Sequence, residues 1–523
     1  MEEPTNRRPT REEEEDLLST LPNDVLISII DKLHLRDAVR LAVLSRRWQC
    51  LANQLPRIHL DIDDFVPNDY DRDHDGCDHV LDYYQEEEEE DIVAPPAAIT
   101  TTTTTADDGY RDILSEAGDR MADVVAALLA SRRRTTAGDD NDEGDLIGAP
   151  AAAHTTLAMR FYLRHNYMTL GRMLDSAVAG GTVHAAELTI TASSILNMYT
   201  KSECDRANLA FAVYGRRFSA LFGACPTAFG ALTQLNLQEM RFHTFDLCDI
   251  LATCTRLEKL SLFRCRPPKQ HKRLWQLQHA QLEDISISIC GVYGVKLVCL
   301  PRLKRFAFLG WLWTTHKLIS FGHVPCLTAV TLSHDMVGED AALKLSHILA
   351  NTAVNDLRLN FKGNDVWVQP ESPRLLIDVF HNLKNLKICN VHQQCGLTWT
   401  MFLLQSAPHL QELYIKLMDH DCLEAATKKV PWEVSTSFKH HSLARVTILG
   451  FYSRDETITM AFIRRLVEAA VVLEKICIRG DTTASLCGSR FPRTDQDKDT
   501  FCKRITDGRS NTSFKIHIQS ILN

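Results

Sequence analysis

The stretch "CTRLEKLSLFRC", residues 254–265, contains the pattern that decides the fold of this chain. Leu257 is followed, after two residues, by the unit Leu260-x-Leu262. Such a unit predicts a short strand whose two leucines point inward while the middle residue points outward. Ten copies of the pattern occur: 232/235/237, 257/260/262, 282/285/287, 303/306/308, 327/330/332, 354/357/359, 383/386/388, 410/413/415, 443/446/448 and 473/476/478.

The spacing of the copies indicates a repeat array. Leu237 and Leu262 are 25 residues apart, and Leu359 and Ile388 are 29 apart. Leucine-rich repeats have a period of about 20 to 29 residues. One repeat cannot bury its own apolar face, so stacking of neighbours has to bury it. We therefore expect an α/β fold built around a curved parallel sheet.

Helices are expected between the strands, covering the sheet. The stretches "FDLCDILATCTRLEKL" (245–260) and "ITMAFIRRLVEAAVVLEKI" (458–476) place apolar residues at helical spacing. Leu188 and Ile190 are expected to begin the array. The repeat domain is accordingly assigned to residues 155–523.

Composition and charge exclude several classes of protein. The 523 residues are 45% hydrophobic with a net charge of −9, which gives no reason to expect nucleic acid or an anionic membrane as partner. The 16 cysteines include no C-x-x-C pair, which favours reduced thiols inside the cell. The chain starts without an apolar leader and has no apolar run of membrane-spanning length. We expect a soluble protein of the cytoplasm, the nucleus or both.

A second apolar region lies near the start, in "LPNDVLISIIDKLHLRDAVRLAVLSRRW", residues 21–48. Its apolar spacing predicts three short helices, the first following Pro22 and the third containing Trp48 and Leu51. A segment of this length is too short to enclose a core of its own. Its apolar surface must therefore be buried against something else.

This segment resembles the F-box in the order and spacing of Leu21-Pro22-x-Asp24-x-Leu26, Leu33-x-Leu35-Arg36-Asp37 and Leu44-Ser45-Arg46-Arg47-Trp48. The resemblance implies the substrate-receptor subunit of a cullin–RING ubiquitin ligase, docked on a Skp-family adaptor. It implies that Trp48 packs inside. The alternative is an ordinary helical cap on the downstream domain. The residues expected to face the adaptor are Leu21, Pro22, Leu26, Ile29, Leu33 and Leu44.

The repeat part is similar to the irregular leucine-rich repeats of plant F-box proteins. The run from Pro431-Trp432-Glu433 to "SFKIHIQS" (513–520) resembles the FBD region that closes many of those chains. The domain boundaries that follow are a disordered tail at 1–16, an F-box at 17–60, an insert at 61–154 and the repeats at 155–523, FBD-like from about 430 to 523.

The insert has a low-complexity, acidic composition, with a glutamate run and a threonine run, and is expected to be largely disordered. Apolar residues at partial helical spacing predict one short helix at 110–133. Asp71-x-Asp73-x-Asp75-Gly76 matches half of a calcium loop, but Asp82 stands where the bidentate glutamate is needed. A solvated acidic linker is the preferred interpretation, and no metal or cofactor is expected.

The sequence lacks the motifs of common enzymes: it contains no phosphate-binding loop, no hydrolase elbow and no zincin or RING spacing. Histidines such as His271, His279, His316 and His440 could join an active site, but lone histidines are usually surface or satisfied core residues. We expect a non-catalytic receptor that brings a protein substrate close to the ligase. A pure interaction scaffold is the alternative, and an enzyme with a novel site is the third reading.

The residues that flank or centre the later strands are often basic. Because such positions line the binding face of a solenoid, they suggest a surface for an acidic or phosphorylated partner. A solvated strand edge is the competing interpretation. Trp311, Trp313, Phe361 and Trp367 are either aromatic anchors at the rim or core residues. The basic candidates are Arg358, Lys387, Lys416, Arg445, Lys475 and Arg479.

Overall fold

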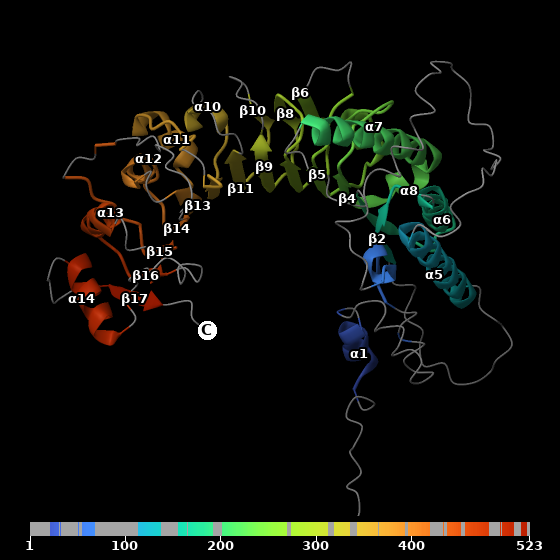
Figure 1. Cartoon of the computed structure of the whole chain (residues 1–523), viewed down its shortest axis with the longest axis horizontal. Coiled ribbons are helices and arrows are strands. Elements are labelled where there is room, and N and C mark those ends of the chain that lie inside the picture. The colour runs from blue at the N-terminus through green and yellow to red at the C-terminus, as the bar shows by residue number, and fades with distance from the viewer. Residues whose placement is uncertain are drawn as a thin grey trace, which may run out of the picture. The chain divides into compact units, whose positions relative to one another are not determined.

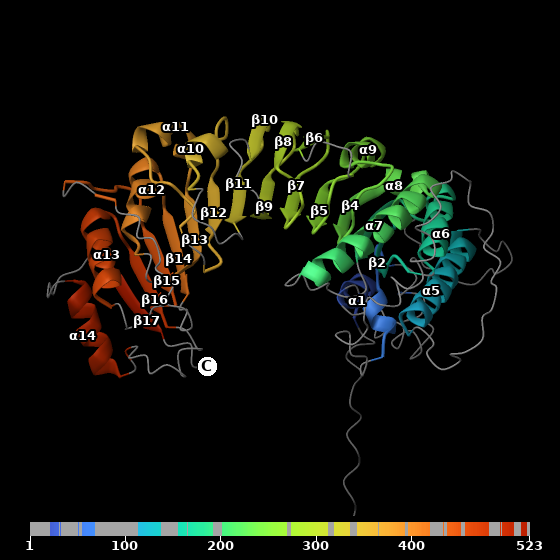
Figure 2. The ribbon, with the colours of Figure 1, turned by 45° about the horizontal axis from the view of Figure 1, so that its top comes forward.

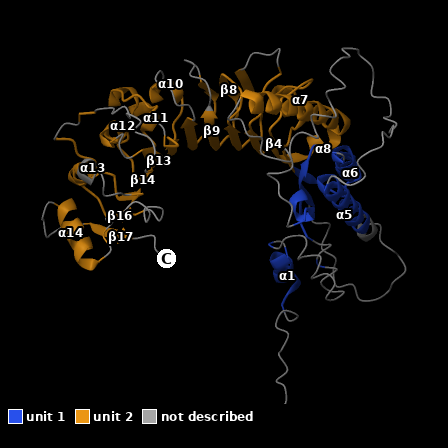
Figure 3. Cartoon of the chain, in the orientation of Figure 1, with its two compact units in different colours: residues 1–70, 104–187 blue, residues 71–103, 188–523 orange. Residues whose placement is uncertain are grey.

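The fold is described from a computed structural model and divides into two compact units (Figure 3). Unit 1 comprises residues 1–70 and 104–187, and unit 2 comprises 71–103 and 188–523. The structure describes residues 21–30, 32, 51, 55–67, 113–136, 155–164, 166–191, 201–268, 274–311, 318–334, 342–363, 366–392, 396–418, 432–433, 437–450, 456–480, 492, 494–506 and 514–519.

Unit 1 combines helices with a pair of parallel strands. In chain order its elements are α1 (Asn23–Ile30), β1 (Arg57–Asp61), the 3₁₀ helix η1 (Ile62–Phe65), α5 (Ile113–Thr136), β2 (Thr156–Tyr162) and α6 (Tyr167–Ala179). β1 pairs in parallel with β2. α5 packs against η1 and α6. β3 (Ala185–Thr191) spans the boundary between the units.

Two small cores hold unit 1. In the first, Leu26 and Ile30 of α1 pack with Leu51 and Leu55. In the second, apolar residues of α5 such as Met121 are buried together with those of the strands. Arg132, near the end of α5, is buried and donates hydrogen bonds to the Thr155 hydroxyl and the Leu55 carbonyl, both at 2.8 Å.

The predicted insert contains more structure in its described part than its composition suggested. η1 follows β1 directly, and α5 is a helix of 24 residues that begins and ends three residues later than the helix predicted at 110–133. Parallel strand pairing also begins at β1, ahead of residue 155. The sequence analysis missed this pairing because β1 and β2 are far apart along the chain, although Leu55, Ile58 and Leu60 follow the spacing of the repeat. The low-complexity stretch itself lies outside the described residues.

Unit 2 contains a curved parallel sheet (Figure 2). Its strand order is β4-β5-β7-β9-β11-β12-β13-β14-β15-β16-β17. All ten predicted units are strands with both apolar residues buried, which confirms the repeat. The strands are β4 (Leu232–Gln238), β5 (Lys259–Phe263), β7 (Asp284–Ser288), β9 (Arg305–Trp311), β11 (Ala329–His334), β12 (Asp356–Asn360), β13 (Asn385–His392), β14 (Glu412–Met418), β15 (Arg445–Leu449), β16 (Lys475–Arg479) and β17 (Lys515–Gln519).

Helices cover much of the outer side of this sheet, as expected (Figures 1 and 2). Both helical stretches predicted between strands are present, as α9 and α13. The helical elements of unit 2 are α7 (Lys201–Ala224), α8 (Pro226–Gly230), α9 (Leu247–Thr253), α10 (Leu345–Ile348), η2 (Pro373–Leu375), α11 (Ile377–Phe380), η4 (Thr398–Thr400), α12 (Met401–Ser406), α13 (Glu456–Ala469) and α14 (Asp495–Ile505).

A second parallel sheet of three strands, rather than helices, occurs in the connections between β5 and β11. Its order is β10-β8-β6, formed by β6 (Leu274–Gln278), β8 (Gly294–Cys299) and β10 (Ile319–His323). In β6, Trp275 and Leu277 are buried while the residues beside them are exposed. This alternation has the period of a strand, so one face of β6 is buried and the other is exposed.

Candidate functional site

The exposed face of α1 is the first candidate site. Val25 and Ile29 are 39% and 37% exposed, and Pro22 is exposed beside them. Residues three and four apart share one face of a helix, so these three side chains form a single apolar edge. We call Pro22, Val25 and Ile29 the α1 edge. Leu21 is half-buried and packs against the core that contains Leu26.

The structure changes the set of residues expected to face an adaptor. Leu26 is completely buried, because it points to the opposite side of α1 from the α1 edge, into the core with Leu51. Val25 takes its place on the exposed side, and its i,i+4 spacing from Ile29 was the signal that could have found it. Leu33, Leu44 and Trp48 lie outside the described residues.

The second candidate site is the exposed face of β12–β17. Side chains alternate along each strand, so residues such as Leu357 and Leu359 enter the core while Arg358 points to the other face. All six predicted basic residues are exposed. The structure therefore places them on one side of the sheet, as the strand pattern predicted.

The strand register arranges these cations in rows across the sheet. Arg358 on β12 lies beside Lys387 on β13, and the next position in that row is Tyr414 on β14. Arg445 on β15 lies beside Lys475 on β16. A further cation that the sequence analysis omitted, Lys515 on β17, continues this second row. The signal that could have identified Lys515 is its position at the start of the alternating residues of β17.

The third row contains the remaining two predicted cations. Lys416 on β14 and Arg479 on β16 are separated by Leu449 on β15. β14 and β16 thus present positive charge at one end of the same face.

Acidic residues neutralise only part of this face. Glu412 pairs with Arg445, whose Nε donates to Oε1 at 2.8 Å. Asp356 accepts a hydrogen bond from Asn385 at 2.5 Å. Among the described residues, the structure gives no ion pair to the other five predicted cations. The exposed face of β12–β17 therefore carries an excess of positive charge.

Tyr414 lies within this charge. Burial raises the pKa of the Tyr414 phenol, and the nearby Cys389 thiol acts in the same direction. The positive charges of Arg358 and Arg479 act in the opposite direction on that pKa, because they favour the phenolate. By strand register, Arg358 lies two strands from Tyr414 on one side and Arg479 lies two strands away on the other.

The aromatic candidates that the structure describes belong to the core. Phe361 and Trp367 are 0% and 4% exposed, with ring centroids 5.3 Å apart. Phe361 also packs against the buried Trp399. Core packing is therefore the right interpretation for these two residues. Trp313 and the side chain of Trp311 lie outside the described part of the chain.

The described histidine candidates also have structural roles. His279 is 7% exposed, and its Nδ1 accepts hydrogen bonds from the amides of Gln281 and Leu282, both at 3.1 Å. Since Nδ1 accepts, Nε2 carries the proton and donates to the Cys254 carbonyl at 2.9 Å. His440 makes the same arrangement in a later repeat. His271 and His316 are not among the described residues.

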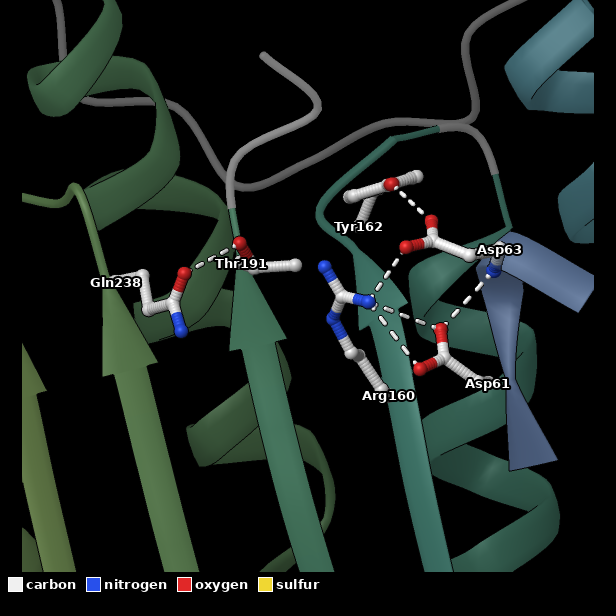
Figure 4. A network of polar contacts seen from close by, with 6 residues as sticks. All are labelled: Asp61, Asp63, Arg160, Tyr162, Thr191 and Gln238. Carbon is white, nitrogen blue, oxygen red and sulfur yellow. Dashed lines mark hydrogen bonds and ion pairs between the residues drawn. The ribbon is translucent and has the colours of Figure 1, made fainter. Parts of the chain in front are cut away.

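Unit 1 contains a polar network that the sequence analysis did not anticipate (Figure 4). Arg160 on β2 donates to Asp61 at 3.2 Å and to Asp63 at 2.5 Å, and Tyr162 donates to Asp63 at 2.5 Å. Burial disfavours the Arg160 charge, but the two carboxylates outweigh it and raise the pKa of Arg160. The network ties the end of β1 to β2, which indicates a structural role.

Figure 4 also shows a separate hydrogen bond in unit 2, which the Thr191 hydroxyl donates to the side-chain oxygen of Gln238.

The Arg160→Met variant tests this role. The change removes the shared cation and leaves Asp61 and Asp63 close together and half-buried. We expect the free energy of unfolding to fall by about 1 to 2 kcal/mol, in chemical denaturation at neutral pH. Tyr162→Phe, which keeps the cation, should cost less, and equal losses from both variants would contradict the assignment.

No group of residues that could hold a metal ion is found in the part of the chain that the structure describes. Within the same residues, no helix is long and apolar enough to cross a membrane.

The repeat fold defines a leucine-rich-repeat protein, and comparisons with known proteins add an F-box that includes α1. The F-box domain model matches residues 18–60. A protein of Arabidopsis thaliana that is named as an F-box protein, At1g67390, is 42% identical over 48 residues, which is 9% of this chain and 10% of that relative. The chain thus matches only a small part of the relative's length.

The leucine-rich-repeat domain model named At1g61320/AtMIF1 matches residues 223–514, which is more than half of the chain. The chain belongs to this family. The matched range includes most of the part that resembles the FBD region, and that finer resemblance stays a prediction. F-box and leucine-rich-repeat domains are interaction modules.

Proposed function

We propose that this protein is the substrate-recognition subunit of an SCF-type cullin–RING ubiquitin ligase. In this proposal α1 and the rest of the F-box dock on a Skp-family adaptor, and through it on the cullin. The exposed face of β12–β17 binds the protein to be ubiquitinated. The chain itself performs no catalysis and works by proximity, since holding a substrate near the ligase raises the local concentration of its lysines. The proposed location is the cytoplasm, the nucleus or both.

The observation that carries the proposal is the α1 edge within the F-box match. The inner side of α1 is occupied by the core residues Leu26 and Ile30, while Val25 and Ile29 remain exposed on the other side. A partner that covered these two side chains would gain the free energy of removing apolar surface from water. The docking residues proposed from the described structure are Leu21, Pro22, Val25 and Ile29.

The Val25→Asp, Ile29→Asp double variant tests adaptor docking. Each aspartate would place a charge in the proposed apolar interface, so we expect at least about tenfold less adaptor to co-purify with the full-length protein. Leu209→Asp is the matched control, because Leu209 is a similarly exposed apolar residue, 45% exposed, on α7. Adaptor recovery that is equal for the double variant and the control would refute the docking assignment.

A non-catalytic scaffold that binds an adaptor without delivering a substrate is the second candidate. Recovery of the cullin together with the adaptor favours the ligase. Proximity labelling with and without proteasome inhibition then looks for proteins that accumulate only when degradation stops. If no protein behaves in this way although cullin is recovered, the scaffold is the better assignment.

A further inference from the structure

A cluster of positive side chains surrounds Tyr414 on the exposed face of the sheet. Arg358, Lys387 and Tyr414 occupy consecutive positions of one row, on β12, β13 and β14. Neighbouring strands are about 4.8 Å apart, so the three side chains stand next to one another. Arg479 on β16 is exposed on the same face, two strands beyond Tyr414 and one row further along. We call Arg358, Lys387, Tyr414 and Arg479 the Tyr414 cluster.

Folding alone does not explain this arrangement. Like charges side by side in a sheet are destabilising, and Arg358 stands directly beside Lys387. Elsewhere on the same face a cation in register with an acid is paired with it, as Arg305 is with Asp284. Among the described residues no acid pairs with any cation of the Tyr414 cluster. A bound anion would supply the missing negative charge.

The cationic region is also limited in extent. In the strands that precede β12, the row that contains Arg358 carries no charge. Its members there are Asn236, Ser261, Ser286, Ala307 and Thr331. The row becomes cationic only at Arg358, which indicates a local binding site rather than a generally basic solenoid.

We infer that the Tyr414 cluster binds the phosphate group of a phosphorylated segment of the client protein. This inference rests on the proposed function and adds the chemical class of the client. A phosphorylated residue carries close to two negative charges and three strong acceptor oxygens at one point. Two arginines and a lysine can neutralise this charge and donate charge-assisted hydrogen bonds to the phosphate oxygens, and the phenol hydroxyl can donate a neutral one. Separate carboxylates would spread their charge over a longer stretch.

Nucleic acid fits this face less well. Asp356 and Glu412 stand on the same exposed side of β12 and β14 as the cluster. They would repel a continuous phosphate backbone, whereas a peptide can carry its negative charge at a single position. The net charge of −9 for the whole chain also disfavours binding of a polyanion.

The test measures peptide binding by the full-length protein in solution. The probes are an oriented peptide library with a fixed central phosphothreonine, the same library with threonine, and a single-stranded RNA of mixed sequence. We expect the phosphorylated library to bind at least about tenfold more tightly than the unmodified one, with weakening at higher salt. The triple variant Arg358→Gln, Lys387→Gln, Arg479→Gln should lose at least about tenfold in affinity for it.

The controls separate a specific site from general charge. Lys296→Gln, Arg374→Gln removes two exposed cations away from the cluster and should leave binding unchanged. Tyr414→Phe should weaken binding modestly, because it removes one donor and no charge. Thermal unfolding establishes that each variant is folded before its affinity is compared.

Four results would overturn the inference: equal affinity for both peptide libraries, an unaffected triple variant, an equal loss in the control variant, or tighter binding of the RNA through the same residues. None of these results bears on adaptor docking. Docking is tested separately, by measuring how much adaptor co-purifies with the Val25→Asp, Ile29→Asp variant. Loss of the phosphopeptide signal with intact adaptor recovery therefore refutes this inference alone. Failure of the unmodified protein to recover adaptor refutes the proposed function.

Discussion

Replacing Gly215 by alanine is expected to lower the free energy of unfolding by about 3 kcal/mol. A Cβ atom at this position of α7 would lie 1.5 Å from the carbonyl oxygen of Arg241. That distance is far inside van der Waals contact, and the obstacle is backbone, which cannot rotate away. The helix or the segment after β4 would have to move.

The surrounding contacts make such a movement costly. The Arg241 amide donates to the carbonyl of Phe211 at 2.8 Å, which joins α7 directly to the segment after β4. The Arg266 guanidinium lies 5.1 Å from the centre of the Phe211 ring. Asn208 accepts hydrogen bonds from both arginines. Residues 208, 211 and 215 share one face of α7, so a shift that relieved the clash would break all of these contacts.

Chemical denaturation of Gly215→Ala, followed by circular dichroism, measures this loss. Gly223→Ala in the same helix is the matched control. A Cβ atom at Gly223 would meet only the Phe245 ring, at 3.8 Å, which is ordinary contact. Since alanine favours helix over glycine, we expect Gly223→Ala to be neutral or to stabilise by up to about 1 kcal/mol. A Gly215→Ala variant as stable as Gly223→Ala would contradict the close approach.

The second large expected effect is a loss of stability below about pH 6.5, caused by His279 and His440. Burial lowers the pKa of both histidines from the ordinary value of 6.5, although the hydrogen bond to a backbone carbonyl acts in the opposite direction. The neighbouring His441 and His409 further lower the pKa of His440. A protonated Nδ1 would also face two amide donors, so the folded state resists protonation.

The sign of the pH effect follows from this difference. The unfolded chain binds protons to these histidines more readily than the folded chain does, so stability is complete above pH 6.5 and falls as the pH drops toward the lowered pKa values. Each histidine contributes a slope of at most about 1.4 kcal/mol per pH unit in that window. Urea denaturation between about pH 5 and 7.5, at constant ionic strength, measures it.

The double variant His279→Gln, His440→Gln is expected to be less stable at neutral pH, because six hydrogen bonds are disturbed. It should also show a flatter pH dependence than the unmodified protein. His243→Gln, which removes an exposed histidine, should leave that dependence unchanged. Identical pH profiles for the double variant and the unmodified protein would show that these two groups do not titrate on unfolding.

The local sequence pattern was sufficient to predict the repeat strands and to predict that the basic residues lie on the exposed face of the sheet. The Leu-x-Leu units are buried on one side and Arg358 or Lys387 is exposed on the other, because side chains of a strand alternate whatever their surroundings. The pattern was insufficient for α1. Helical spacing showed an apolar helix but not which apolar side chains its own core would take, and Leu26 was assigned to the wrong side.

The sequence by itself determined the parallel repeat, the F-box segment and the absence of common catalytic motifs, since each depends on residue types at short spacing. Only the tertiary structure decided that Arg358, Lys387 and Arg479 share one exposed face with Tyr414, that β1 pairs with β2, and that Gly215 must lack a side chain. These features depend on register and close approach between residues far apart in the chain. Such contacts are set by how neighbouring elements pack, and no local spacing encodes them.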